Sequence, residues 1–105
     1  MKDQVAVIGV GCTKFGDLFE HGYEDLICEA AFDAYQDANI DPADIQAAYL
    51  GTYMPGAAGG KAAVSLGDAL RLYDRPITRV ENYCATGTDA FRNACLAIAS
   101  GTYDV

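Results

Sequence analysis

Cys84 stands at a point in the chain where a nucleophile would be well placed. It lies between an apolar run at residues 77–80, which predicts a strand, and a run of small and apolar residues ending near Ser100, which predicts a helix. The free backbone N–H groups and the positive dipole end of such a helix would point at the thiol. That setting favours thiolate over thiol, and the same N–H groups can bind an oxyanion that develops on an attacked carbonyl. The pattern therefore predicts that Cys84 is a nucleophile.

The helix that follows Cys84 is unusually apolar for a small domain. One face has apolar residues at helical spacing, most other positions are small, and Asp89 and Arg92 carry its only charges. A helix that is apolar on nearly all sides is typical of the protein interior. We therefore expect this helix to be packed between other layers. Its apolar face consists of Phe91, Ala94, Cys95 and Ile98.

The rest of the chain alternates segments with strand and helix patterns. The β-branched run at residues 5–10 is typical of a strand covered on both faces. Strand, helix and strand in this length form a parallel crossover unit, so the chain is predicted to be an α/β domain. The expected elements are a strand at 5–10, a helix at 23–39, a strand at 47–54, a helix at 62–73, the strand at 77–80, the helix after Cys84 and the start of a fourth strand at 103–105.

The helix expected at residues 23–39 has two different faces. Small residues dominate one face, which allows close approach to a neighbouring layer. Acidic residues four apart occupy another face, where like charges cost rather than add local stability, so a solvated outer face is expected. The apolar face comprises Ile27, Ala30, Ala31, Ala34, Tyr35 and Ala38, and the acidic face Asp25, Glu29, Asp33 and Asp37.

Glycine-rich stretches in this chain do not fit nucleotide-binding motifs. Gly9 and Gly11 follow the first predicted strand, but the next glycine is at 16 and no helix begins at once, so a dinucleotide fingerprint is disfavoured. The segment 55–61 starts with proline where a Walker loop has glycine, and Ala62 follows where Ser or Thr would bind magnesium. Segment 55–61 is expected to be either a plain connector or a loop that borders the active site or a subunit contact.

The remaining cysteines and the single histidine predict no metal centre. No Cys-x-x-Cys pair occurs, and His21 is expected at the surface rather than as a catalytic base. Cys84 and Cys95 would lie about 16 Å apart on one helix, too far for a disulfide. Cys12, Cys28 and Cys95 are expected to be small buried hydrophobic residues.

Charge and hydropathy exclude several function classes. The net charge of −8 disfavours binding to nucleic acid or to an anionic membrane surface. No apolar run approaches the length of a membrane span, and the N-terminus enters a strand without a signal-peptide pattern. We therefore expect a soluble cytoplasmic protein.

The segment around Cys84 resembles the nucleophile segment of thiolases. The closest branch is that of the sterol-carrier-protein-type thiolases, which are often called acetyl-CoA acetyltransferases. The residues that carry the resemblance are Asn82-Tyr83-Cys84-Ala85-Thr86-Gly87, Ala90 and the segment 96–105, with a weaker match of residues 5–11 and 13–16 to the opening strand and loop. The resemblance implies the N-terminal part of a layered thiolase fold with a buried nucleophile helix, and residues 1–105 are expected to form part of a single, incomplete domain.

The resemblance also implies a reaction. Cys84 would take the acyl group from an acyl-CoA, and a carbon–carbon bond would then form with a second acyl-CoA; in the degradative direction, coenzyme A cleaves a 3-ketoacyl-CoA. Coenzyme A is then a substrate, with no bound cofactor and no metal. Thiolases supply the acid and base from later histidine and cysteine motifs, which residues 1–105 do not match, so this segment alone is expected to be inactive.

Partners and alternatives follow from the same resemblance. The rest of a thiolase chain, a homo-oligomer (dimer or tetramer) and, as in some members, a small zinc-ribbon and oligonucleotide-fold subunit are expected partners. Two alternatives stay open: another enzyme on this fold, such as a hydroxymethylglutaryl-CoA synthase, a ketoacyl synthase or a thiolase-like aldolase, and a non-catalytic thiolase-like subunit.

Overall fold

Two short parallel strands form the centre of the structure. In the computed structural model, which describes residues 2–53 and 63–105, β1 (Ala48–Gly51) pairs with β2 (Ile77–Val80). Ala48 lies opposite Ile77, and Gly51 lies opposite Val80. Parallel strands cannot be joined by a tight turn, and the connection between them contains α2 (Val64–Leu70).

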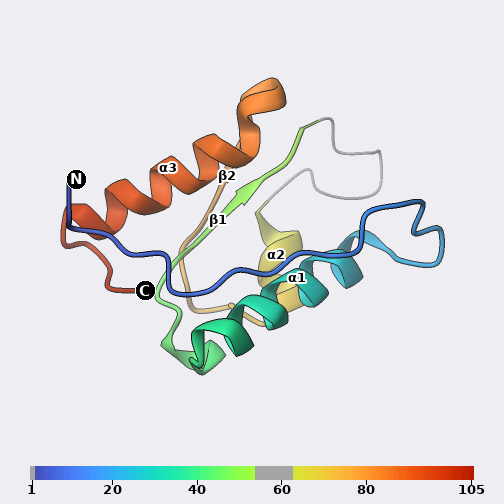
Figure 1. Cartoon of the computed structure of the whole chain (residues 1–105), viewed down its shortest axis with the longest axis horizontal. Coiled ribbons are helices and arrows are strands. Elements are labelled where there is room, and N and C mark those ends of the chain that lie inside the picture. The colour runs from blue at the N-terminus through green and yellow to red at the C-terminus, as the bar shows by residue number, and fades with distance from the viewer. Residues whose placement is uncertain (1, 54–62) are drawn as a thin grey trace.

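Helices cover both sides of this pair of strands. α3 (Thr86–Ala99) lies over one side, and α1 (Tyr23–Ala38) lies with α2 on the other side (Figure 1). The predicted α/β fold class is confirmed. The helix expected at 23–39 and the strand expected at 77–80 are found within one residue of their predicted bounds, whereas β1 is shorter than the predicted strand at 47–54.

The bounds of α1 follow from its flanking residues. Gly22 is the N-cap, and its backbone N–H donates to the Asp25 carboxylate at 2.8 Å. At the other end Asn39 adopts a left-handed conformation with φ 52°, which Asn tolerates better than most residues. Pro42 then opens a one-turn 3-10 helix (Pro42–Asp44) that is capped by Asp41. Of the predicted acidic face of α1, Asp25, Asp33 and Asp37 are exposed and Glu29 is half-buried. The face is not solvated throughout, because the Asp37 carboxylate accepts a hydrogen bond from the Val10 N–H at 2.9 Å.

The prediction of a sheet strand at residues 5–10 is wrong in this structure. The segment is extended but pairs with neither strand, and it runs along α1 (Figure 1). Gly9 and Gly11 bring its backbone so close to α1 that an added Cβ would lie 2.4 Å from the Ala34 carbonyl oxygen and 2.0 Å from that of Ala30, respectively. The small residues on α1 thus allow the close approach that was expected, but against this segment.

Two further differences concern helix and strand ends. α2 is shorter than the helix predicted at 62–73, because Arg71 adopts a left-handed conformation with φ 56° and ends it. Residues 103–105 are not a strand, although the Val105 carbonyl accepts a hydrogen bond from the Gln46 N–H at 2.9 Å. The glycine-rich segment at 55–61 lies outside the described residues.

α3 is covered on one side only within residues 2–53 and 63–105. Thr86 and Ala90 are buried, but Phe91 is 56% exposed, so the expected packing on all sides is not found there. The predicted apolar face of α3 instead lines a groove of about 420 Å³ whose other wall is the N-terminal segment. We call it the α3 groove; its lining includes Val5, Val7, Phe91, Ala94, Cys95 and Ile98.

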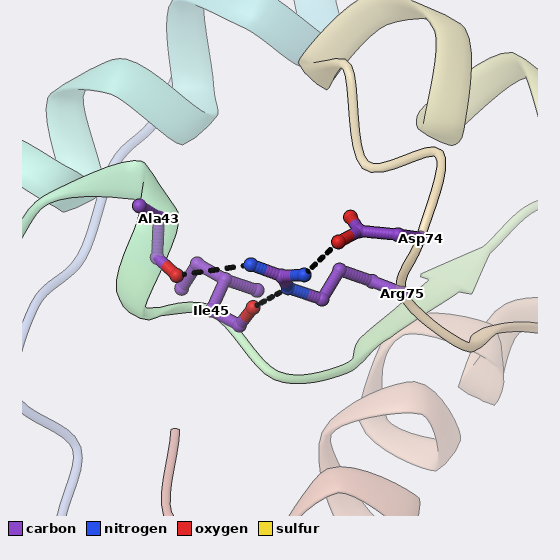
Figure 2. A network of polar contacts seen from close by, with 4 residues as sticks. All are labelled: Ala43, Ile45, Asp74 and Arg75. Atoms are coloured by element: carbon purple, nitrogen blue, oxygen red, sulfur yellow. Dashed lines mark hydrogen bonds and ion pairs between the residues drawn. The ribbon is translucent and has the colours of Figure 1, made fainter.

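Arg75 ties the loop before β1 to the loop before β2. Its Nε donates to the Ile45 carbonyl at 2.6 Å and its Nη2 to the Ala43 carbonyl at 3.2 Å, while Nη1 lies 2.5 Å from the Asp74 carboxylate (Figure 2). These contacts fix the chain where it enters both strands.

None of the helices in the described parts of the chain is long and apolar enough to cross a membrane.

Candidate active site

Cys84 lies at the junction between β2 and α3, as the sequence predicted. It occupies a 3-10 turn (Tyr83–Ala85) that leads directly into α3, and its side chain is exposed. The α-helix itself begins at Thr86, so Cys84 precedes the first helical turn instead of opening it. The thiol is therefore accessible at the amino end of α3.

Thr86 holds this turn together. Its hydroxyl accepts a hydrogen bond from the Asn82 N–H at 2.8 Å and donates to the Tyr83 carbonyl at 2.7 Å. The Ala85 N–H also donates to the Asn82 carbonyl at 2.9 Å. Thr86 is 5% exposed, so both hydroxyl bonds are partly buried and restrict the position of Cys84.

Tyr83 has a backbone conformation that is costly for its type. Its φ is 48°, in the left-handed region, where a bulky residue is a genuine outlier. The Glu81 carboxylate accepts a hydrogen bond from the Tyr83 N–H at 2.7 Å and supports this conformation. A strained residue directly before Cys84 is typical of a turn that presents a functional side chain.

The amino end of α3 has no side-chain cap. Neither Ala85, the N-cap of α3, nor Asn82, the N-cap of the preceding turn, makes a side-chain cap hydrogen bond. N–H groups at the start of a helix that no side chain satisfies can bind an anion or a developing oxyanion. The arrangement therefore suits a cysteine that attacks a carbonyl group.

The carboxyl ends of both strands adjoin the turn. A Cβ on Gly51 would lie 3.0 Å from the Thr86 carbonyl oxygen, so the end of β1 packs tightly against the start of α3. Arg79 on β2 donates from Nε to the Thr52 hydroxyl at 2.6 Å and from Nη2 to the Thr52 carbonyl at 3.1 Å. In open parallel sheets, ligands bind beyond the carboxyl ends of the strands, where Cys84 is found.

The Tyr23 hydroxyl is buried and lies near Arg79. Within the described residues the Tyr23 hydroxyl has no hydrogen-bond partner. Burial raises the pKa of Tyr23 above its ordinary value of 10.0, and the nearby positive charge of Arg79 offsets only part of that rise. The phenol is therefore protonated at neutral pH and is not a base for the thiol.

The other cysteines and the histidine lie elsewhere. His21 is exposed, as predicted, with Nε2 3.8 Å from the Glu29 carboxylate. Cys12 is exposed, so its predicted burial is wrong, because the loop after the N-terminal segment has nothing packed over it in the described chain. Cys28 and Cys95 are half-buried, and the Cys28 thiol donates to the Ala69 carbonyl at 3.3 Å.

Sequence reasoning did not single out several residues of this site. Thr86 appeared only as part of a motif, and nothing indicated that Gly51 would pack against it or that Arg79 would contact Thr52. A signal for Thr86 was present: Thr at a helix start commonly bonds to nearby backbone groups. The contacts of Gly51 and Arg79 depend on how β1 and β2 are paired, which no local pattern encodes.

Comparison with known proteins places this geometry in a family. A family model described as the thiolase N-terminal domain matches residues 5–105. The chain is 41% identical over 107 residues to an acetyl-CoA acetyltransferase of Methanothermobacter thermautotrophicus, covering 100% of this chain and 28% of that protein. It is 42% identical over 107 residues to an acetyl-CoA acetyltransferase of Methanocaldococcus jannaschii, covering 100% of this chain and 27% of that protein. Sterol carrier protein 2 of Gallus gallus is 35% identical over 106 residues, which are 99% of this chain and 19% of that protein.

A solved structure shares the fold at low sequence identity. The 3-oxoacyl-[acyl-carrier-protein] synthase III from Aquifex aeolicus superposes with a TM-score of 0.69 at 21% identity, covering 80% of this chain and 27% of that one. The chain spans little more than a quarter of the two acetyltransferases it matches. The resemblance inferred from the Cys84 segment is confirmed, and the chain belongs to the thiolase family, whose N-terminal domain model it matches from residue 5 to residue 105.

Proposed function

We propose that this chain supplies the nucleophile of a thiolase-type acyl-CoA acyltransferase, with Cys84 as the acyl acceptor. The observation that carries the proposal is the exposed thiol in a restrained turn at the uncapped amino end of α3. Its membership of the thiolase family and its identity to two proteins named acetyl-CoA acetyltransferase support acyl transfer as the activity.

The proposed first step is transfer of an acyl group between two sulfur atoms. The Cys84 thiol loses its proton to a base, and the thiolate attacks the thioester carbonyl to form a tetrahedral oxyanion. As the oxyanion collapses, the bond from the carbonyl carbon to the sulfur of coenzyme A breaks, and coenzyme A leaves as a thiolate that takes up a proton. Backbone N–H groups near the start of α3 are suited to stabilising the oxyanion.

The second step joins the acyl group to a second acyl-CoA, or runs in reverse as thiolytic cleavage of a 3-ketoacyl-CoA. Both directions need a base and an acid near Cys84. His21 is paired with Glu29 on α1, so we propose that these groups come from another part of the protein. No cofactor takes part in this proposal, and coenzyme A is a substrate.

Location and assembly are part of the same proposal. All four cysteines are free, which suits a reducing compartment, and we propose the cytoplasm. Val7, Ile8 and Phe91 are more than half exposed around the α3 groove, which suits a surface covered by the remainder of a thiolase chain. A homo-oligomer, a dimer or a tetramer, is proposed for the whole protein.

Acylation of Cys84 tests the proposal directly. The full-length protein is incubated with acetyl-CoA and its mass is measured by intact-protein and peptide mass spectrometry. We expect the mass of one acetyl group on the peptide that contains Cys84, and mild iodoacetamide treatment should modify Cys84 ahead of the other three cysteines and block acetylation.

Two variants make this test specific. Cys84→Ala should gain no acetyl group, whereas Cys95→Ala, which changes a thiol further along the same helix, should be acetylated normally. Acetylation elsewhere, or none at all together with no preferential alkylation of Cys84, would favour a non-catalytic thiolase-like subunit. Acetylation of Cys84 without carbon–carbon bond formation or cleavage would favour another enzyme on this fold.

A further inference from the structure

Arg79 fixes the carboxyl end of β1. It pairs with Leu50 in the strand register, and its side chain reaches Thr52, two residues further along the chain. Nε donates to the Thr52 hydroxyl at 2.6 Å and Nη2 to the Thr52 carbonyl at 3.1 Å, and both bonds are partly buried. The Thr52 N–H donates to the Val80 carbonyl at 3.3 Å. These three hydrogen bonds hold the residue that directly follows β1.

The same strand end is packed against α3 on its other side. Arg79 lies near Tyr23 of α1, whereas Gly51 meets Thr86 of α3, and the two helices cover opposite sides of the strands (Figure 1). A Cβ at Gly51 would lie 3.0 Å from the Thr86 carbonyl oxygen and 3.1 Å from Thr86 Cγ2. The backbone of Gly51 therefore lies directly against Thr86, and the arginine holds that backbone from behind.

Thr86 connects this packing to the turn that carries the thiol. Its hydroxyl accepts a hydrogen bond from the Asn82 N–H at 2.8 Å and donates to the Tyr83 carbonyl at 2.7 Å. Cys84 follows Tyr83 directly, so a shift of the Thr86 hydroxyl also shifts the backbone that bears the thiol. Closely packed groups transmit small displacements, because few voids are present to absorb them.

We propose that Arg79 is a positioning residue for acyl transfer to Cys84. By fixing Thr52 it holds Gly51 against Thr86, and the Thr86 hydroxyl in turn fixes the turn that places the thiol. The inference rests on the proposed function of Cys84. In this role Arg79 acts through the residues between it and the turn, and it needs no contact with the thiol or with acetyl-CoA.

Single-turnover acylation of the full-length protein by acetyl-CoA, followed by mass spectrometry over a range of concentrations, tests the inference. Arg79→Lys keeps the charge but lacks the planar fork that reaches both Thr52 oxygens. A misplacement of about 1 Å can cost about a hundredfold in rate; the shift expected here is smaller, so the maximal rate should fall about three- to tenfold. The acetyl-CoA concentration that gives half the maximal rate should change by less than about twofold, because substrate binding is untouched.

The matched control is Arg92→Lys. Arg92 is an exposed arginine of α3 whose guanidinium pairs with Asp89 three residues earlier. This variant makes the same chemical change away from the strand ends, and its maximal rate should equal that of the wild type. A wild-type maximal rate in Arg79→Lys would overturn the inference, even if the variant is less stable. An unchanged maximal rate with a raised half-maximal concentration would also overturn it, because Arg79 would then be a substrate-binding residue.

A double variant tests the route through Thr86. In Thr86→Val the hydroxyl that links the packing to the turn is already absent. Adding Arg79→Lys to Thr86→Val should therefore lower the maximal rate by less than about twofold further, although the two residues make no hydrogen bond to each other. If the double variant instead shows the full product of the two single losses, Arg79 acts by another route and the inference fails.

A second pair of variants decides the question if Arg79→Lys does not fold, as judged by circular dichroism. Thr52→Val removes the hydroxyl that accepts from Arg79 Nε, whereas Thr52→Ser keeps a hydroxyl there. The maximal acylation rate should fall in Thr52→Val and stay near the wild-type value in Thr52→Ser. Equal rates in these two variants would overturn the inference.

The wild-type protein separates this inference from the function on which it rests. Acylation of wild-type Cys84 at a rate that the Arg79 and Thr52 variants do not change would overturn only the role of Arg79. Absence of acylation of wild-type Cys84 by acetyl-CoA would overturn the proposed function, and the positioning role with it.

Discussion

Thr86 is the residue on which the position of Cys84 most depends, because its hydroxyl serves two backbone groups of the turn. Thr86→Val keeps the shape of the side chain but removes both hydrogen bonds, leaving the Asn82 N–H and the Tyr83 carbonyl without that partner. We expect a loss of about 1–3 kcal/mol in the free energy of unfolding. The rate of Cys84 acylation should fall by about ten- to a hundredfold, because the nucleophile is displaced from its attacking position.

The matched control is Thr86→Ser, which keeps the hydroxyl and loses one methyl group. It should retain most of the stability and most of the acylation rate, measured by urea denaturation and by mass spectrometry on the full-length protein. Equal losses in the Val and Ser variants would show that methyl packing, and not the two hydrogen bonds, holds the turn.

At the scale of elements, the contact between the N-terminal segment and α1 requires glycine. Gly11→Ala would place a Cβ 2.0 Å from the Ala30 carbonyl oxygen, and the backbone of an α-helix cannot yield by the amount needed. We expect a loss of at least about 1–3 kcal/mol in the free energy of unfolding, as in other overpacked sites, measured by chemical denaturation.

Gly87→Ala is the control for the glycine substitution. An added Cβ at Gly87 meets no heavy atom within 4 Å, and the residue lies in α3, where Ala is the better helix former by up to about 1 kcal/mol. The stability of this variant should be unchanged or higher. A Gly11→Ala protein as stable as wild type would mean that the segment does not pack on α1 as closely as the structure has it.

At the scale of the whole molecule, Arg75 connects loops that are far apart in the sequence. Its side chain reaches the carbonyls of Ala43 and Ile45 from the loop that precedes β2. Arg75→Lys keeps the charge but cannot reproduce the fork of N–H donors, so we expect a loss of about 1–2 kcal/mol in the free energy of unfolding. Asp74→Asn, which alters an exposed ion pair with the same arginine, should change stability by less than about 1 kcal/mol.

These two variants are compared by thermal and urea unfolding of the full-length protein. If Asp74→Asn lowers the free energy of unfolding as much as Arg75→Lys does, the ion pair, and not the two carbonyl contacts, holds the loops that lead into β1 and β2. A Lys variant with wild-type stability would show that the network in Figure 2 contributes little to the fold.

The helix at 23–39 and the strand at 77–80 could be predicted from the sequence, because each is specified by signals within a few residues. Helical spacing of small residues and the turn at Asn39 and Pro42 mark the helix, and the β-branched run marks the strand. The junction at Cys84 was predicted from the change between the strand pattern at 77–80 and the helical pattern that follows Cys84. Family membership followed from the residues around the same cysteine.

What the sequence determined by itself is therefore local: which segments are helical or extended, and which thiol precedes a helix. The tertiary structure decided that residues 5–10 lie against α1 outside the pair of strands and that α3 is covered on one side in the described parts of the chain. It also decided that Gly51 packs against Thr86 at the turn and that Arg79 contacts Thr52. Those outcomes depend on contacts between residues distant in the chain, and a β-branched run has the same pattern whether it pairs in a sheet or packs on a helix. Tyr53 comes to lie beside Tyr83 for the same reason, since only the pairing of β1 with β2 brings the two rings together.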